Sequence, residues 1–312
     1  MDAFLLLSYG APERKEEVLP FLHHVLADKD VPAERLVAAT AKYHELARRT
    51  GRFSPLNDEC RRLLAGVRKE LNEHGPKLEV YWGNLHGQPF LDDTVAEMSA
   101  NGVRRAVCFA TSAFDSPQGN RRYADALEAA CRKIGPTAPM IDKLPLPFGH
   151  PLFIEAQADR LLSALAQALL DDPENRSDAV RILFSAHAVP ERDATRYVSQ
   201  LHETCRAVAD KIGPVSYELV FQSRSGRPSE PWTGPDIRDR VREIAVEGRY
   251  RSIVVSPIGF FCENAETLWD LDQEVGDLCG DLGFVRAAAV GATPTICRMI
   301  RELVTAGTHE DR

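Results

Sequence analysis

The sequence predicts an α/β protein of two doubly wound lobes, each with a parallel sheet covered by helices on both faces. Short, continuous apolar runs rich in Val, Ile, Leu and Phe alternate with amphipathic stretches throughout the 312 residues. Runs of this kind suit strands that are buried on both faces, as in parallel sheets. A join rich in Pro and Gly, LPLPFGHP, falls at 144–151. We therefore expect lobes at 1–146 and 147–312 with a cleft between them, and a last helix free to pack back on the first lobe.

The expected strands fall four before the join and four after it. The apolar runs that predict them are 4–10, 77–84, 104–114, 140–145, 179–187, 216–223, 251–261 and 284–290. Amphipathic helices lie between them, most clearly AERLVAATAKYHELARR at 33–49 and PLFIEAQADRLLSALAQALL at 151–170. The segment SPLNDE at 54–59 combines a capping Ser with Pro and acids, which predicts the start of a helix. AVCFATSAF in one half faintly echoes IVVSPIGFF in the other, as a duplication would.

Composition and charge exclude several classes of function. The net charge is −8 and basic residues form no long run, so a nucleic-acid surface is not expected. No apolar stretch reaches the roughly 18 residues of a membrane span, and the N-terminal MDAFLLLSYG lacks the basic start of a signal peptide. The 7 cysteines contain no CxxC pair, which argues against a disulfide framework and a Cys-based zinc or iron–sulfur site. We expect a cytoplasmic protein.

Functional residues are expected just after the strands, because ligands of open α/β sheets bind beyond the carboxyl ends. No GxGxxG or P-loop occurs there, so nucleotide phosphate binding is not supported. The side chains that follow the strands instead include a phenol, two imidazoles, a hydroxyl, a guanidinium and a phenyl ring: Tyr9, His86, Thr111, His187, Arg224 and Phe260.

Each of these residues has a structural interpretation beside the functional one. His187 is either a hydrogen-bonded histidine at a strand end or a base or metal ligand, with small neighbours that leave room for a large flat ligand. Tyr9 is either a core residue or a phenol that points into the cleft. His86 is open to the same two interpretations. Arg224 and Arg227 are either surface charge or partners for carboxylates of an anionic ligand, and Trp232 is either core or cleft wall.

An acidic row follows the run at 251–261. Glu266, Asp270 and Glu274 recur at a spacing of four, which places them on one face of a helix. Like charges at this spacing repel, and a solvated face is the simplest explanation. The alternative is a ladder that carries protons or a divalent cation, and its hard oxygen ligands make it a candidate Mg²⁺ site.

Five segments in order resemble the ferrochelatase family: LLLSYGAP (5–12), FSPLN (53–57), FSAHAVP (184–190), FQSRSGRPSEPWTGPDI (221–237) and SPIGFFCENAETLWDLDQE (256–274). Any one of them alone is weak, whereas the ordered set is specific and spans almost the whole chain. The resemblance implies two flavodoxin-like, chelatase-type lobes with a porphyrin cleft, and insertion of Fe²⁺ into a porphyrin. It also implies porphyrin and ferrous iron as partners, transient handover to neighbouring enzymes of haem synthesis, and no permanently bound cofactor.

The resemblance also implies roles for individual residues. His187 and Glu266 match the facing histidine and glutamate of the family's cleft, with Asp270 and Glu274 as the acids behind them. Tyr9 matches the residue below the macrocycle, which is commonly tyrosine in enzymes for coproporphyrin III and methionine in many for protoporphyrin IX. All five are therefore expected near the metal. Substrate-binding residues are expected at Tyr9, Ser54, His86, Thr111, Arg224, Trp232 and Phe260.

The chemistry of metal insertion fits these residue types. A free-base porphyrin loses two pyrrole protons as the metal enters, and histidine is a natural acceptor near neutral pH. Imidazole, phenolate and carboxylate are reasonable ligands for Fe²⁺ as it loses water. A bend imposed on the ring would expose the nitrogen lone pairs, which is catalysis by complementarity to a distorted state.

The sequence also departs from the family. The segment at 25–28, near the end of the first helix, lacks the arginine that often docks propionates there. Thr233 stands where leucine is frequent, and neither the cysteine cluster of iron–sulfur members nor their C-terminal extension is present, so we expect a cluster-free monomer. Candidate replacements for the missing arginine are Arg48, Arg49, Arg52, Arg121 and Arg122.

Coproporphyrin III ferrochelatase is the preferred interpretation, and protoporphyrin IX ferrochelatase is the first alternative. A non-catalytic porphyrin or haem carrier would not need a proton acceptor facing a carboxylate. A cobalt chelatase for a corrinoid precursor often carries further metal-binding histidines, whereas this chain has only 9 histidines and no cluster of them after the run at 251–261.

Overall fold

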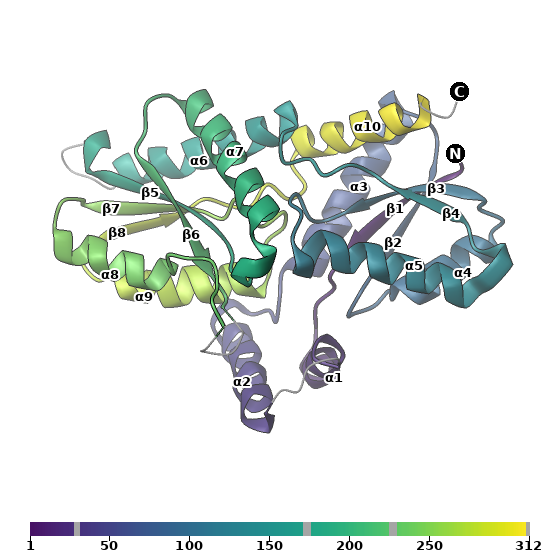
Figure 1. Ribbon diagram of the computed structural model, residues 1–312, viewed down its shortest axis with the longest axis horizontal. Helices are drawn as coiled ribbons and strands as arrows, with labels where there is room; N and C mark the ends of the chain where they lie inside the picture. Colours follow the sequence, from purple (N-terminus) through teal and green to yellow (C-terminus); the bar gives the residue numbers. More distant parts are fainter. Residues whose placement is uncertain (28–31, 171–175, 225–229, 310–312) are drawn as a thin grey trace. The chain divides into compact units, whose positions relative to one another are not determined.

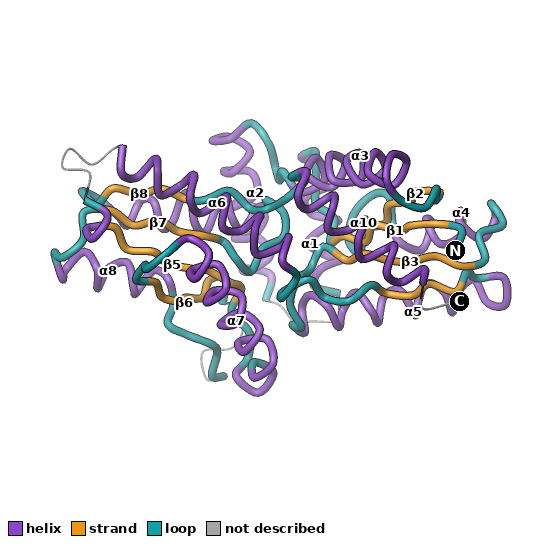
Figure 2. The backbone as a smooth tube through the Cα atoms, turned by 90° about the horizontal axis from the view of Figure 1, so that it is seen from above, coloured by secondary structure: helices purple, strands orange, loops and turns teal. Residues whose placement is uncertain are grey.

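The computed structural model describes residues 1–27, 32–170, 176–224 and 230–309. Within them, the strands form two four-stranded sheets with the orders β2-β1-β3-β4 and β6-β5-β7-β8. Every neighbouring pair is parallel, so the chain must cross over between strands, and helices provide the crossovers (Figures 1 and 2). The predicted class, two doubly wound lobes with parallel sheets, is confirmed.

The first sheet carries helices on both faces. One face is covered by α3 and α10 and the other by α4 and α5 (Figure 1). Leu5 and Leu7 of β1 are fully buried on the latter side, in one cluster with Val95 and Leu127. A separate helix pair, α1 and α2, encloses a small core around Phe21. The elements are β1 (Ala3–Ser8), α1 (Lys15–Val25), α2 (Ala33–Thr50), α3 (Leu56–His74), β2 (Glu79–Asn84), α4 (Leu91–Ala100), β3 (Arg105–Ala110), η1 (Pro117–Arg121), α5 (Arg122–Ile134), η2 (Gly135–Thr137), β4 (Met140–Lys143) and α10 (Pro294–His309).

The second sheet repeats this plan. Helices α6 and α7 cover one face, and α8, η5 and α9 cover the other, where Leu183, Val220 and Val255 are fully buried. None of the described helices, including the apolar α6, is long and apolar enough to cross a membrane. The elements are α6 (Pro151–Leu170), η3 (Ser177–Ala179), β5 (Val180–His187), η4 (Glu191–Asp193), α7 (Thr195–Ile212), β6 (Tyr217–Gln222), α8 (Ile237–Glu247), β7 (Ser252–Ser256), η5 (Thr267–Val275), α9 (Gly276–Cys279) and β8 (Gly283–Arg286).

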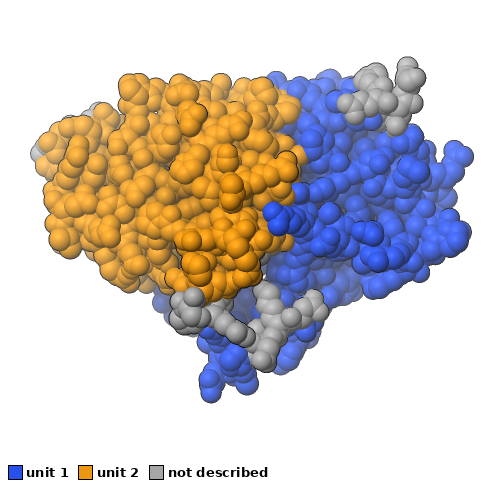
Figure 3. Space-filling model, viewed as in Figure 1, with its two compact units in different colours: residues 1–111, 120–145, 291–312 blue, residues 112–119, 146–290 orange. Residues whose placement is uncertain are grey.

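The chain divides into two compact units, shown in different colours in Figure 3. The first unit comprises residues 1–111, 120–145 and 291–312, and the second comprises 112–119 and 146–290. This division differs from a single break after residue 146, because the chain passes from one unit to the other more than once. The C-terminal helix α10 belongs to the first unit, where it packs against α3.

All eight predicted strands occur in the described residues, but several end earlier than their apolar runs. The clearest case is the run 251–261, since β7 ends at Ser256. Pro257 cannot donate a hydrogen bond to a neighbouring strand, and the next residues turn instead, with the Phe260 N–H donating to the Pro257 carbonyl at 2.9 Å. Apolar character therefore marked burial correctly here but not secondary structure.

Candidate active site

His187 is the last residue of β5, so it lies at the carboxyl edge of the second unit's sheet. Its ring Nδ1 lies 2.6 Å from the carbonyl oxygen of Ala188, which only accepts hydrogen bonds. Nδ1 therefore carries a hydrogen, and Nε2 of the neutral ring is left as a basic nitrogen. The side chain is 25% exposed, and Nε2 lies 3.7 Å from Oε1 of Glu266. That distance is too long for a hydrogen bond but suits an ion pair once the ring is protonated.

Glu266 stands at the start of the acidic helix. The side-chain oxygen of Asn264 accepts hydrogen bonds from the backbone N–H groups of Glu266 (2.8 Å) and Thr267 (3.0 Å). Asn264 thus fixes the first turn, as an N-cap does. The Glu266 side chain is 45% exposed, so its carboxylate can exchange protons with solvent or substrate. The pair His187–Glu266 combines a base with a carboxylate that stabilises the base after it has accepted a proton.

The acidic helix is not the α-helix that the spacing predicts. Residues Thr267–Val275, η5, form a π-helix, in which hydrogen bonds join residues five apart. Such helices are rare and frequently occur at functional sites. Two acids of the row are held by donors of the second unit. The Ser223 hydroxyl donates to Asp270, and Trp269 Nε1 donates to Glu274 at 2.7 Å.

Ser223 itself has an unusual backbone. Its φ is 60°, in the left-handed region that residues other than glycine seldom adopt. The hydrogen bond from its hydroxyl to Asp270 helps to hold it there, and joins the end of β6 to the acidic helix. A strained residue at a carboxyl edge marks this part of the sheet as a candidate site.

A largely buried ion network fixes the segment that leads into the acidic helix. Arg286, at the end of β8, donates to Asp272 through Nε (2.5 Å) and Nη2 (2.9 Å) and to Glu263 through Nη1 (2.9 Å). Glu263 also accepts hydrogen bonds from the Ala289 N–H and the Thr267 hydroxyl, both at 2.7 Å. Burial acts to raise the pKa of Glu263, but the Arg286 charge and these donors outweigh it and hold that pKa below its ordinary value. We refer to Arg286, Glu263 and Asp272 as the Arg286 network.

The turn after β7 packs directly on β5. The Gly259 N–H donates to the carbonyl of Ser185 at 3.0 Å, and a Cβ at Gly259 would lie 2.7 Å from Cα of Ala186. We therefore expect Gly259→Ala to displace the turn and to lower the free energy of unfolding by about 1–3 kcal/mol, as overpacking does. Chemical denaturation measures the change. Gly149→Ala is the control, because its Cβ would find only an ordinary contact at 3.5 Å, and equal stability of the two variants would contradict the expectation.

The first unit brings two of the predicted residues together at its own carboxyl edge. The backbone N–H groups of Leu85 and His86 donate to the carbonyls of Ser8 and Tyr9, so the segments after β1 and β2 stay paired. The rings of Tyr9 and His86 meet edge to face with centroids 4.5 Å apart. Gly10 follows with φ of 81°, and a side chain there would collide with Gly87 at 2.8 Å. Close pairing of these segments thus depends on glycine.

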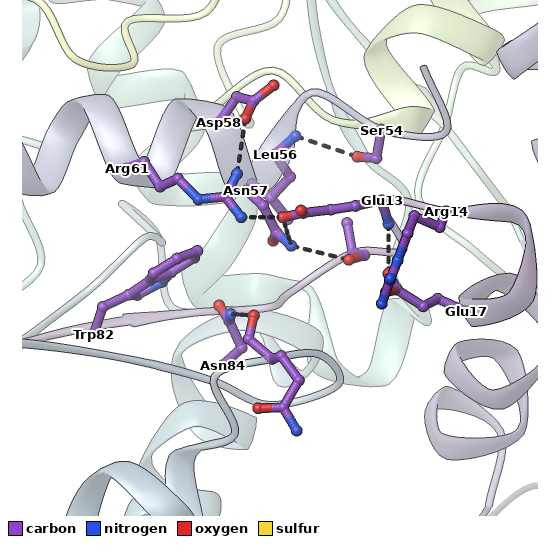
Figure 4. A network of polar contacts seen from close by, with 12 residues as sticks. Glu13, Arg14, Glu17, Ser54, Leu56, Asn57, Asp58, Arg61, Trp82 and Asn84 are labelled. Atoms are coloured by element: carbon purple, nitrogen blue, oxygen red, sulfur yellow. Dashed lines mark hydrogen bonds and ion pairs between the residues drawn. The ribbon is translucent and has the colours of Figure 1, made fainter. Parts of the chain in front are cut away.

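Ser54 lies two residues before α3 and contacts the start of that helix, as Figure 4 shows. Its hydroxyl accepts a hydrogen bond from the N–H of Leu56, the first residue of α3, at 3.3 Å. The helix start predicted at 54–59 is confirmed, but the N-cap is Pro55, without a side-chain capping bond, and not Ser54. Asn57 in the first turn of α3 donates to the Ala11 carbonyl (3.0 Å) and to Glu13 (2.8 Å). The segment that follows Tyr9 is therefore tied to α3 (Figure 4).

The remaining predicted residues are more dispersed. The Thr111 hydroxyl lies 3.4 Å from the hydroxyl of Tyr123, and Phe260 is 8% exposed in the turn after β7. Trp232 forms an isolated bridge with Pro190. Arg224 donates to the Glu230 carbonyl at 3.1 Å, within the loop that follows β6. Arg227 lies outside the described residues.

Two residues beside His187 were missed in the sequence. The Tyr197 hydroxyl, on α7, donates to the backbone carbonyl of His187 at 3.2 Å. Burial raises its pKa, and the Glu266 charge adds to the rise, so the hydroxyl keeps its hydrogen and remains a donor. Gln222 pairs with His187 in the sheet and is only 2% exposed. A polar residue directly after the apolar run LVF (219–221) was the available signal for Gln222, whereas nothing in the sequence distinguished Tyr197.

In the part of the chain that the structure describes, side chains alone do not form a site for a resident metal ion. No group of three or more His, Cys, Asp or Glu residues among these residues converges in a way that could hold an ion. His187 and Glu266 provide two such ligands. Further ligands for a metal at this pair would then come from the molecule that receives it, as a tetrapyrrole's nitrogens can.

Comparisons with known proteins agree on one family. The family model described as Ferrochelatase matches residues 1–308. A protein named Ferrochelatase from Rhodopirellula baltica is 39% identical over 307 residues, covering 97% of this chain and 85% of the relative. Proteins named Coproporphyrin III ferrochelatase from Nocardia farcinica and Frankia alni are 40% and 41% identical, each covering 97% of this chain and 87% and 79% of the relative.

Solved structures agree on the fold. SirB from Bacillus subtilis with Fe³⁺ covers 100% of this chain and 98% of its own, with a TM-score of 0.57 and 12% identity. The sirohydrochlorin chelatase SirB from Bacillus subtilis subspecies spizizenii, in complex with cobalt, has a TM-score of 0.52. At this identity the likeness concerns the fold alone. The assignment to a family rests instead on the match over residues 1–308 and on relatives that are about two-fifths identical over nearly all of the chain. On this evidence the chain belongs to the ferrochelatase family of enzymes.

Proposed function

We propose that this protein inserts Fe²⁺ into coproporphyrin III to form coproheme. The observation that carries the proposal is the pair His187–Glu266 at the carboxyl edge of the second sheet, in which a basic Nε2 lies 3.7 Å from the carboxylate of a half-exposed side chain. Membership of the ferrochelatase family supplies the reaction class. Iron is a substrate in this reaction and not a resident cofactor.

The pair is suited to the proton chemistry of metal insertion. As the metal enters, two pyrrole N–H groups must each lose a proton, and Nε2 of His187 is the acceptor we assign. The Glu266 carboxylate stabilises the imidazolium that forms, and its exposure lets the proton leave. Asp270 and Glu274 lie further along the same helix and extend the acidic path, and Mg²⁺ binding by this row stays a prediction.

Two observations favour coproporphyrin III as the porphyrin. Relatives from Nocardia farcinica and Frankia alni carry that substrate in their names, at 40% and 41% identity. The residue that the family resemblance places below the macrocycle is Tyr9, and tyrosine is the residue typical of coproporphyrin enzymes. Its ring lies beside His86 at the carboxyl edge of the first sheet.

The test is anaerobic Fe²⁺ insertion followed by absorbance, with coproporphyrin III and protoporphyrin IX assayed in parallel. We expect a higher kcat/KM for coproporphyrin III. A preference for protoporphyrin IX would assign the other substrate of the family. Binding of both porphyrins without insertion into either would favour the carrier.

Tyr9→Met tests the assignment of Tyr9 to the macrocycle. Loss of the phenol removes both a candidate iron ligand and an edge contact with His86, so we expect the variant to retain metallated product less tightly. Product dissociation is measured by stopped-flow absorbance, and the product's absorption band is compared with that of the wild type. An unchanged band and unchanged dissociation would remove Tyr9 from the site.

A further inference from the structure

Arg122 presents a positive charge beside Tyr9. It is the first residue of α5, directly after the π-turn η1, and its guanidinium carbon lies 6.0 Å from the centroid of the Tyr9 ring. Contact with an aromatic face attracts a cation but does not neutralise it. Among the described residues, no carboxylate forms an ion pair or hydrogen bond with the half-buried Arg122.

The chain on either side of Arg122 is held by contacts with the ends of the neighbouring strands. Lys143, the last residue of β4, donates to the side chain and the backbone carbonyl of Asn120, two residues before Arg122. Tyr123 lies next to Arg122, and its hydroxyl is 3.4 Å from that of Thr111 after β3. The guanidinium is therefore presented from the anchored start of α5, at the same carboxyl edge as Tyr9 and Thr111.

The other arginines that could replace the missing one are placed differently. Arg48 and Arg49 both contact the same oxygen of Glu45, at 2.6 and 2.8 Å. Hydrogen bonds from Arg48 and Arg49 lower the pKa of Glu45 to about 2, so Glu45 stays ionised and pairs with both. Arg52 is exposed in the segment after α2, and Arg121 is exposed on the turn before α5. Arg122 is thus the candidate that the structure places against Tyr9.

We infer that Arg122 binds a propionate carboxylate of the porphyrin that contacts Tyr9. A planar guanidinium offers paired N–H donors that match a carboxylate, and partial burial against the Tyr9 ring strengthens that interaction. An alkyl group in the place of the propionate would leave the charge unpaired, so the residue selects for a substrate with an acidic side chain at this point. The inference rests on the proposed function, because that function supplies a porphyrin with propionates.

Binding without iron tests the inference separately from catalysis. The affinity of Arg122→Ala for iron-free coproporphyrin III, followed by porphyrin fluorescence, is expected to fall on the order of tenfold or more, the effect of losing a charge-assisted hydrogen bond. Arg122→Lys keeps the charge without the planar fork and should recover part of the affinity. Arg132→Ala, on the same helix but 71% exposed and paired with Glu128, should bind as the wild type does.

A porphyrin without carboxylates separates recognition of the propionate from support of Tyr9. Etioporphyrin, whose side chains are all alkyl, is presented in detergent micelles, and its affinity should be the same for the wild type and Arg122→Ala. An equal loss of affinity for both porphyrins in Arg122→Ala would mean that Arg122 acts only by packing on Tyr9. An unchanged affinity for coproporphyrin III would remove Arg122 from the site. Either result overturns the inference. If the wild type fails to insert iron but Arg122→Ala still loses affinity for coproporphyrin III alone, only the proposed reaction is overturned.

Discussion

Arg286→Met is expected to destabilise the second unit by about 3–5 kcal/mol at neutral pH, since removing one partner of a buried pair leaves uncompensated charge. The side chains of Arg286 and Glu263 are only 11% and 16% exposed, and Arg286 is also bound to Asp272. The expected result is a lower midpoint in chemical denaturation. Because Glu263 precedes the acidic helix and accepts a hydrogen bond from Thr267 within it, metal insertion should fall with stability.

The pH dependence makes this prediction specific. In the wild type the pKa of Glu263 is held below its ordinary value of 4.5, so its contribution is present above pH 4.5 and is lost as the pH falls through the folded-state pKa. In Arg286→Met the buried carboxyl loses its cation, its pKa rises, and protonation then stabilises the folded state. The difference in unfolding free energy between the two proteins should therefore shrink as the pH is lowered from 7 towards 4.

Arg242→Met is the matched control. Arg242 contacts Asp239 at 2.7 Å on α8 of the same unit, but the two side chains are 56% and 71% exposed. An exposed pair contributes about 0–1 kcal/mol, so this variant should remain close to the wild type at every pH. If both variants lost the same free energy of unfolding at every pH, the Arg286 network would contribute no more to stability than an exposed ion pair does.

The sequence was sufficient for the fold class and for the existence of the strands, because both depend on hydrophobic periodicity. It was insufficient wherever a contact between distant residues decides local structure. Pro257 and Gly259 fall in an apolar run, yet the strand ends before Pro257, and the turn that follows brings Gly259 too close to Ala186 of β5 for a side chain. The π-helix at Thr267–Val275 likewise cannot be read from a spacing of four, which an α-helix would satisfy as well.

The same contrast holds for the candidate site. His187 and Glu266 could be selected because the residues after parallel strands share one edge, and the structure places them 3.7 Å apart. Tyr197 could not be selected, since its link to His187 is a hydrogen bond to a backbone carbonyl, which no side-chain motif encodes. The Arg286 network could not be selected either, because Arg286 lies 14 positions after Asp272 and 23 positions after Glu263, and no motif links them.

His187→Ala is expected to lower kcat for metal insertion by about 10²–10⁴-fold, the range that a positioned general base contributes. Nε2 is the basic nitrogen at the carboxyl edge, and an alanine leaves the pyrrole protons with solvent as their acceptor. Binding of iron-free coproporphyrin III should survive, because the backbone carbonyl to which Tyr197 donates is still present. Absorbance measures insertion, and porphyrin fluorescence measures binding.

Two further variants separate the base from its surroundings. Glu266→Gln keeps the shape but removes the charge that stabilises the imidazolium, so its insertion rate should fall less than that of His187→Ala. His202→Ala, an exposed histidine on α7, should insert iron at the wild-type rate. Turnover of His187→Ala close to that of His202→Ala would remove His187 from proton transfer. Glu266, whose side chain is 45% exposed, would then become the acceptor to test next.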